Sequence, residues 1–87
     1  MLLKIGQIVY SKAGRDSGNP HVIVAVDGDY AYIVDGNSRP LARAKKKKGK
    51  HIQPTNDIEH AFAAKIEASA YVNDAEVVKL LKAYCNR

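Results

Sequence analysis

The sequence predicts a mainly β domain that ends in helices: a small barrel of about five strands followed by two helices. Residues 1–54 contain short β-branched runs separated by turn residues. Beyond about residue 57 the apolar residues change to helical spacing. The chain has 87 residues, enough for one domain but too few for two independent cores. We therefore expect residues 1–54 to form the barrel and residues 55–87 a helical extension packed on it, within the same domain.

Three strands are predicted at residues 7–12, 21–27 and 30–34. The second is β-branched, and the glycine of Asp27-Gly28-Asp29 supplies the positive φ that a tight hairpin turn needs. Turn residues are dense in residues 13–20, which predicts a loop between the first two strands. Apolar residues on both faces of the second strand favour a small barrel over a one-sided sheet.

Two further strands are predicted from weaker patterns. Residues 39–44 form the first, and Pro40 places it at an edge because proline cannot donate to a ladder. Four lysines at 45–48 then predict a loop. Residues 50–53 form the last short strand, which Pro54 closes.

A helix is predicted over residues 74–85. Its apolar stripe follows the spacing i, i+3, i+4, i+7 and consists of Val77, Leu80, Leu81 and Tyr84. Asn73 precedes Glu76 by three residues, which is the arrangement of a capping box at a helix start.

An earlier helix is predicted over residues 57–68. The residues that share its apolar face are Ile58, Phe62 and Ile66. Asn56 and Glu59 repeat the capping spacing, and residues 69–73 form the turn. The two helices can cover an open end or flank of the barrel and protect its edges.

Positive charge is concentrated in one window of the chain. The net charge is +5, yet residues 1–38 and 52–87 are each net −1. Residues 39–51 hold seven cations and no acid: Arg39, Arg43, Lys45, Lys46, Lys47, Lys48 and Lys50. Because like charges repel, such a cluster predicts a polyanion partner; the competing interpretation is a solvated lysine loop that aids solubility. A membrane surface is disfavoured because the lysines are not interleaved with an apolar face.

The order of these features resembles the KOW motif, a strand, a glycine-bearing loop and a second strand. The resemblance covers roughly residues 6–54: Gly18 matches the loop glycine, and residues 35–41, the lysine run and residues 50–53 follow in order. This ordered set is similar to bacterial KOW-domain RNA-binding proteins, which are related to a large-subunit ribosomal protein family of archaea and eukaryotes. The resemblance implies an SH3-like barrel and an RNA partner, with ribosomal RNA as the leading candidate.

The predicted RNA-binding residues follow from the charge window and the resemblance. They are Arg15, Arg39, Arg43, Lys45, Lys46, Lys47, Lys48, Lys50 and His51, with Gly14 and Gly18 as structural loop glycines. Lysine is a flexible point charge suited to phosphate contacts, so we expect docking on backbone phosphates with selectivity from RNA shape. Two members have competing interpretations: Arg15 as a local ion pair with an aspartate, and His51 as a partly exposed strand residue.

Three tyrosines are candidates for stacking on unpaired bases: Tyr10, Tyr30 and Tyr32. Tyr30 and Tyr32 share one strand face. In a small barrel, tyrosines also commonly complete the core with the hydroxyl at the surface, so both interpretations stay open.

The sequence contains no recognisable catalytic or metal-binding pattern. A single cysteine and three widely spaced histidines match no metal motif, so we expect no metal, no cofactor and no enzyme activity. The start lacks a signal-peptide core and no apolar stretch could span a bilayer, so we expect a cytoplasmic protein. We also expect it to be a monomer. Two alternatives remain: a KOW module of transcription-factor type that binds transcription or ribosomal proteins, and a DNA-binding protein.

Overall fold

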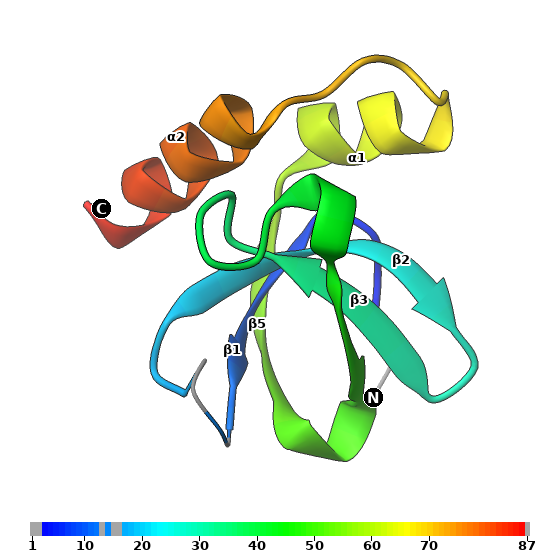
Figure 1. Cartoon of the computed structure of the whole chain (residues 1–87), viewed down its shortest axis with the longest axis vertical. Helices are drawn as coiled ribbons and strands as arrows, with labels where there is room; N and C mark the ends of the chain where they lie inside the picture. Colours follow the sequence, from blue (N-terminus) through cyan, green and yellow to red (C-terminus); the bar gives the residue numbers. More distant parts are fainter. Residues whose placement is uncertain (1–2, 13, 15–16, 87) are drawn as a thin grey trace.

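The computed structural model describes residues 3–12, 14 and 17–86. Strands and helices follow in the predicted sequence, strands first (Figure 1). The strands are β1 (Gln7–Ser11), β2 (Pro20–Asp27), β3 (Tyr30–Val34), β4 (Lys45–Lys48) and β5 (Ile52–Ile58). Single 3₁₀ turns, η1 (Leu41–Arg43) and η2 (Gly49–His51), flank β4, and the chain continues into α1 (His60–Glu67) and α2 (Asp74–Cys85).

The strands form one antiparallel sheet in the order β4-β3-β2-β1-β5, so β4 and β5 are its edges. Both helices lie at the same end of the curled sheet (Figure 1). A five-stranded antiparallel sheet followed by two helices confirms the predicted fold class, and it is consistent with a small SH3-like barrel. No helix in the described ranges is long and apolar enough to cross a membrane.

The interior of the barrel is an aliphatic cluster from four strands. Its fully or almost fully buried members are Val9, Ile23, Ala31, Ile33 and Ile52. The β2–β3 hairpin aligns Ile23 with Ile33 and ends in the predicted turn at Gly28, whose φ is +59°. The three strands predicted from β-branched patterning are thus confirmed, because alternate residues of each have a buried site to fill.

A second cluster lies between the sheet and the helices. Its buried members are Ile8, Val22, Val34, Phe62, Val77 and Leu81. The two clusters take alternate residues of the same strands, which explains why β2 is apolar on both faces. The predicted stripe of α2 is confirmed, and the side chain of Asn73 caps this helix by accepting a 2.8 Å hydrogen bond from the backbone N–H of Glu76.

The window at residues 39–48 differs from the prediction. The expected strand at residues 39–44 is wrong, because Pro40 instead begins the 3₁₀ turn η1, closed by a 2.9 Å bond from the N–H of Arg43 to the carbonyl of Pro40. The expected lysine loop is also wrong, because Lys45–Lys48 pairs with β3 as β4. Lysine has a low strand propensity, but a strand edge that offers backbone donors and acceptors overrides it.

The last strand is longer than predicted, and it displaces the start of the first helix. Pro54 lies within β5 opposite Val9 rather than closing it, since an edge strand tolerates a missing N–H. Asn56 is therefore a strand residue, and the capping box predicted there is wrong. The helix α1 begins at His60 with Glu59 at its N-cap, where no side-chain cap bond forms.

The loop that follows β3 makes close contact with α2. Gly36 has a φ of +80°, and a Cβ added to it would lie 2.6 Å from the carbonyl oxygen of Asp74 and 3.1 Å from the Cβ of Val77. Both the backbone conformation and the close approach therefore require glycine at this position.

We predict that Gly36→Ala destabilises the protein more than Gly28→Ala. Both positions have positive φ, which costs an alanine about 1–2 kcal/mol, but an added Cβ at Gly28 would meet no atom within 4 Å. Overpacking against α2 adds about 1–3 kcal/mol at Gly36. Urea unfolding measures the difference through the midpoint at constant m-value. Equal losses for the two variants would contradict the contact between Gly36 and α2.

Candidate nucleic-acid interface

The four lysines of β4 divide between the two sides of the strand, because successive side chains of a strand point to opposite faces. In register with β3, the opposite pairs are Lys48 with Tyr30, Lys47 with Ala31, Lys46 with Tyr32 and Lys45 with Ile33. Lys46 and Lys48 thus share the outer face of the sheet with the two tyrosines. The lysine run is therefore an ordered edge strand whose side chains alternate between two faces.

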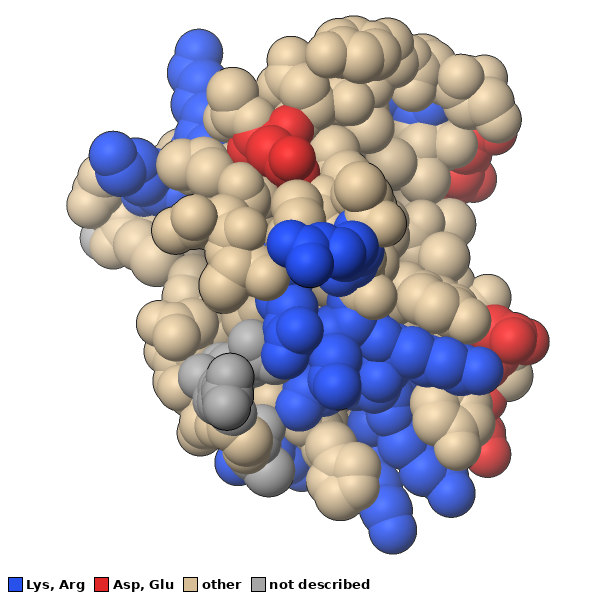
Figure 2. All heavy atoms as spheres, in the orientation of Figure 1, with Lys and Arg blue, Asp and Glu red and all other residues tan. Residues whose placement is uncertain are grey.

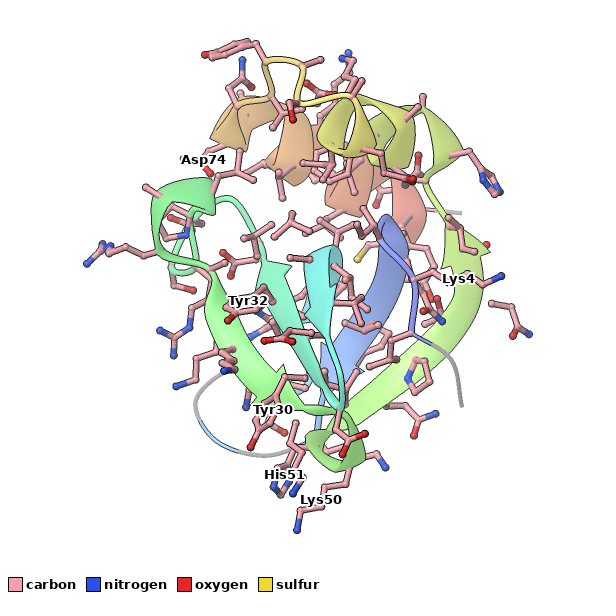
Figure 3. All side chains as sticks on the ribbon, turned by 90° about the vertical axis from the view of Figure 1, so that its right-hand side faces the viewer. Lys4, Tyr30, Tyr32, Lys50, His51 and Asp74 are labelled. Carbon is pink, nitrogen blue, oxygen red and sulfur yellow. The ribbon has the colours of Figure 1, made fainter. Side chains whose placement is uncertain are left out.

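Tyrosine and lysine side chains are in contact on this outer face. The Nζ of Lys46 lies 4.7 Å from the ring centroid of Tyr30 and 5.8 Å from that of Tyr32. Tyr30 is 38% exposed and Tyr32 is half-buried. Both labelled rings lie beside β4, one above the other, in Figure 3. We call Tyr30, Tyr32, Lys46 and Lys48 the lysine–tyrosine strip.

Lys45 and Lys47 lie on the other side of the strand. Lys47 is half-buried, and its Nζ lies 3.9 Å from the position that a Cβ on Gly14 would occupy. Its ammonium group is therefore close to the segment between β1 and β2. Lys45 is exposed, so it can reach solvent from this side.

Three of the other predicted residues lie on the turns that flank β4, and Arg39 lies in the loop before η1. Arg43, Lys50 and His51 are exposed, and Figure 3 shows Lys50 and His51 at the end of the sheet opposite the helices. Arg39 is half-buried. In the view of Figure 2, Lys and Arg side chains gather on the lower part of one face, with acidic side chains at its margins.

Predicted residues of the β1–β2 loop are placed only in part. Arg15 lies outside the described residues. Gly14 and Gly18 both have a φ of +83°, the left-handed conformation that favours glycine. The predicted residues of 39–51 thus lie along β4 and the segments that flank it, and Lys47 lies next to Gly14.

The loop at residues 35–39 is organised by the carboxylate of Asp35. It accepts 2.8 Å bonds from the backbone N–H groups of Asn37 and Arg39, and a 2.9 Å bond from the hydroxyl of Ser38. Burial acts to raise the pKa of Asp35. The hydrogen bonds from the backbone N–H of Arg39 and the other donors outweigh this effect, and the electrostatic interaction with His21 acts in the same direction. Together they hold the pKa below its ordinary value. This loop sets the position of Arg39 at the start of the basic window.

Two hydrogen bonds donated by backbone N–H groups hold the turns on either side of β4. The N–H of Leu41 donates a 2.8 Å bond to the carboxylate of Asp74, the first residue of α2. At the other end, the N–H of Gly49 donates a 2.7 Å bond to the carbonyl of Asp29 in the β2–β3 turn. Sequence reasoning missed both, because each joins residues distant in the chain; an acid in the first turn of a helix indicates only a favourable charge there.

A cavity of about 670 Å³ lies beside the end of β4. Its apolar lining includes Leu3, Ile52 and Pro54. Its charged lining consists of Lys12, Lys48 and Lys50 with one acid, Asp29. Lys12 thereby extends the basic surface beyond the predicted window. Within the described part of the chain, no three His, Cys, Asp or Glu side chains gather closely enough to hold a metal ion.

Comparison with known proteins places the chain among ribosomal proteins. It is 31% identical over 83 residues to the large ribosomal subunit protein eL14 of Pyrobaculum calidifontis; the alignment covers 94% of the chain and 74% of the relative. No family model matches the chain. The relative is archaeal, so the comparison supports the ribosomal side of the resemblance rather than its bacterial group.

We predict that Asp35→Asn changes how stability depends on pH. A carboxylate whose pKa is lowered by folding stabilises the protein above its ordinary pKa of about 4, and this contribution is lost as the pH falls through the folded pKa. The variant should therefore be less stable than wild type at pH 7, and the two should converge in acid. Urea unfolding from pH 7 to pH 3 checks this. A difference that stays constant over that range would contradict it.

Proposed function

The chain belongs to the family of the large ribosomal subunit protein eL14, and from this premise we propose that it is a ribosome-associated protein that binds structured RNA. Ribosomal RNA is the leading candidate for this RNA. It would act in the cytoplasm as a monomer, without a cofactor or a catalytic step. We also propose, from the order of features in residues 6–54, that it is similar to bacterial KOW-domain RNA-binding proteins. In this proposal residues 1–54 form a barrel and residues 55–87 a helical extension within one domain.

The observation that carries this proposal is the ordered basic edge. β4 and its flanking turns present exposed cations on a window that contains no acid. Four of these cations are Arg43, Lys46, Lys48 and Lys50. Phosphates of an RNA backbone would neutralise them and release condensed counterions, which favours binding. Contacts of this kind position an RNA without reading base edges, so its shape would supply selectivity.

A purely protective role for the lysines is the simplest competing explanation. An edge strand exposes unpaired backbone groups, and lysines on it discourage pairing with another chain. Such protection concerns only the charges on β4 itself. Seven cations in thirteen residues exceed that set and carry a cost from mutual repulsion. A polyanion relieves this repulsion, which favours the binding function.

We predict a steep salt dependence of RNA affinity. If about five cations meet phosphates, a fourfold rise in salt should weaken binding by roughly 10²–10³. Fluorescence anisotropy with a folded ribosomal RNA fragment measures the affinity at salt concentrations from about 50 to about 200 mM. A flat response, or no affinity at 50 mM salt, would overturn the proposal. Duplex DNA as a competitor tests the DNA-binding alternative, since equal competition would favour it.

We further predict that Lys48→Gln with Lys50→Gln weakens binding by about ten- to a hundredfold at 0.1 M salt and lowers the salt slope by about two. The matched control is Lys79→Gln with Lys82→Gln on α2, which lowers the net charge by the same amount and removes exposed lysines outside the window. It should change the slope much less. Equal effects of the two pairs would show that net charge alone attracts the RNA. Protein partners captured equally by wild type and the Lys48/Lys50 variant, without RNA, would favour the protein-interaction alternative.

A further inference from the structure

We propose that Tyr30 and Tyr32 form a stacking platform for unpaired RNA bases, so that the protein recognises a single-stranded loop or bulge and not only a paired helix. This proposal rests on the proposed RNA-binding function. It adds the class of RNA element and the residues that meet its bases. Every base has a flat π-face, so the platform would accept bases with little regard to sequence.

The first argument is that the two rings are not used by the barrel core. They alternate along β3 with Ala31 and Ile33, which are fully buried and fill the interior. Tyr10, the third stacking candidate, instead has its ring 6.4 Å from that of Tyr84 on α2. Of these three tyrosines, the structure thus leaves the pair on β3 for a ligand.

The second argument is the position of the Lys46 ammonium group. It lies over Tyr30 at 4.7 Å and near Tyr32 at 5.8 Å, so both rings present a face to the same point. A surface that holds a cation over two aromatic faces can also hold a base there. Base–aromatic stacking raises affinity about five- to a hundredfold per base, whereas an exposed cation–π contact is worth about two- to fivefold. A base can therefore displace the ammonium group.

The third argument is that displacement does not leave Lys46 without a partner. A base stacked on the tyrosines brings its own phosphate group to the adjoining β4, where Lys46 and Lys48 share the same face. The ammonium group then exchanges a ring for a phosphate, which is the stronger partner in a charge-assisted bond. A protein segment that stacked an arginine here would instead meet repulsion from both lysines. The strip therefore favours RNA over a cationic protein partner.

The test compares two RNAs of equal length, a hairpin with an unpaired loop and a blunt, fully paired duplex. The variant is Tyr30→Thr with Tyr32→Thr, because threonine keeps strand propensity while removing both rings. Wild type should prefer the hairpin. The variant should lose about five- to thirtyfold in affinity for the hairpin, and little for the duplex.

Two matched variants isolate the rings. Tyr30→Phe with Tyr32→Phe keeps the aromatic faces and should bind the hairpin as wild type does. Tyr71→Thr removes an aromatic ring that is 81% exposed but belongs to the segment that joins α1 to α2, outside the candidate interface. This variant should bind the hairpin as wild type does. A loss with the phenylalanine pair equal to that with the threonine pair would overturn stacking in favour of a role for the hydroxyl groups.

The outcomes separate this proposal from the proposed function. If wild type binds neither RNA, RNA binding itself fails. If wild type binds both with a steep salt slope and the threonine pair binds the hairpin equally well, only the platform is overturned. Should the threonine pair not fold, ultraviolet crosslinking of wild type to the hairpin decides: crosslinks at Tyr30 or Tyr32 support the platform, and crosslinks confined to other residues overturn it.

Discussion

The backbone pairing of β4 with β3 determines where the charges of the candidate interface lie. The pairing converts four consecutive lysines, which would repel one another in a loop, into a strand with alternating sides. The inward residues of β3, Ala31 and Ile33, are fully buried and hold β3 in register. β4 inherits that register through the ladder, so the packing of the barrel core positions Lys46 and Lys48 beside the two tyrosines.

Hydrogen bonds hold both ends of this edge. On one side the carboxylate of Asp35 organises the loop at residues 35–39, and α2 holds η1 through Asp74. On the other side the β2–β3 turn holds η2 at Gly49. The helices therefore have two roles, since they bury the second cluster, between the sheet and the helices, and α2 also fixes the start of the basic edge. Loss of the contact between Gly36 and α2 should therefore change the position of the basic edge as well as lower the stability of the fold.

Charge and aromatic surface act together in the proposed interface. Lysines on phosphates would supply affinity that depends on salt, and they would not distinguish one RNA segment from another. The tyrosines could distinguish paired from unpaired RNA, because a base inside a helix cannot leave its neighbours without cost. Membership of the eL14 family, which is a family of ribosomal proteins, fits an RNA partner.

The sequence by itself determined β1, β2, β3 and α2, because their cues are local: β-branched alternation, a glycine at the hairpin turn, and an apolar stripe with Asn73 at its cap. It also located the charge, since counting needs no structure. Only the tertiary structure decided that Lys45–Lys48 is a strand and that Pro54 lies inside one. Lysine and proline both disfavour strands locally, and the deciding factor was an edge of β3 or β1 that is brought beside them by folding. The meeting of Lys46 with Tyr30 and Tyr32 is of this second kind, because it depends on register between strands and leaves no trace in sequence spacing.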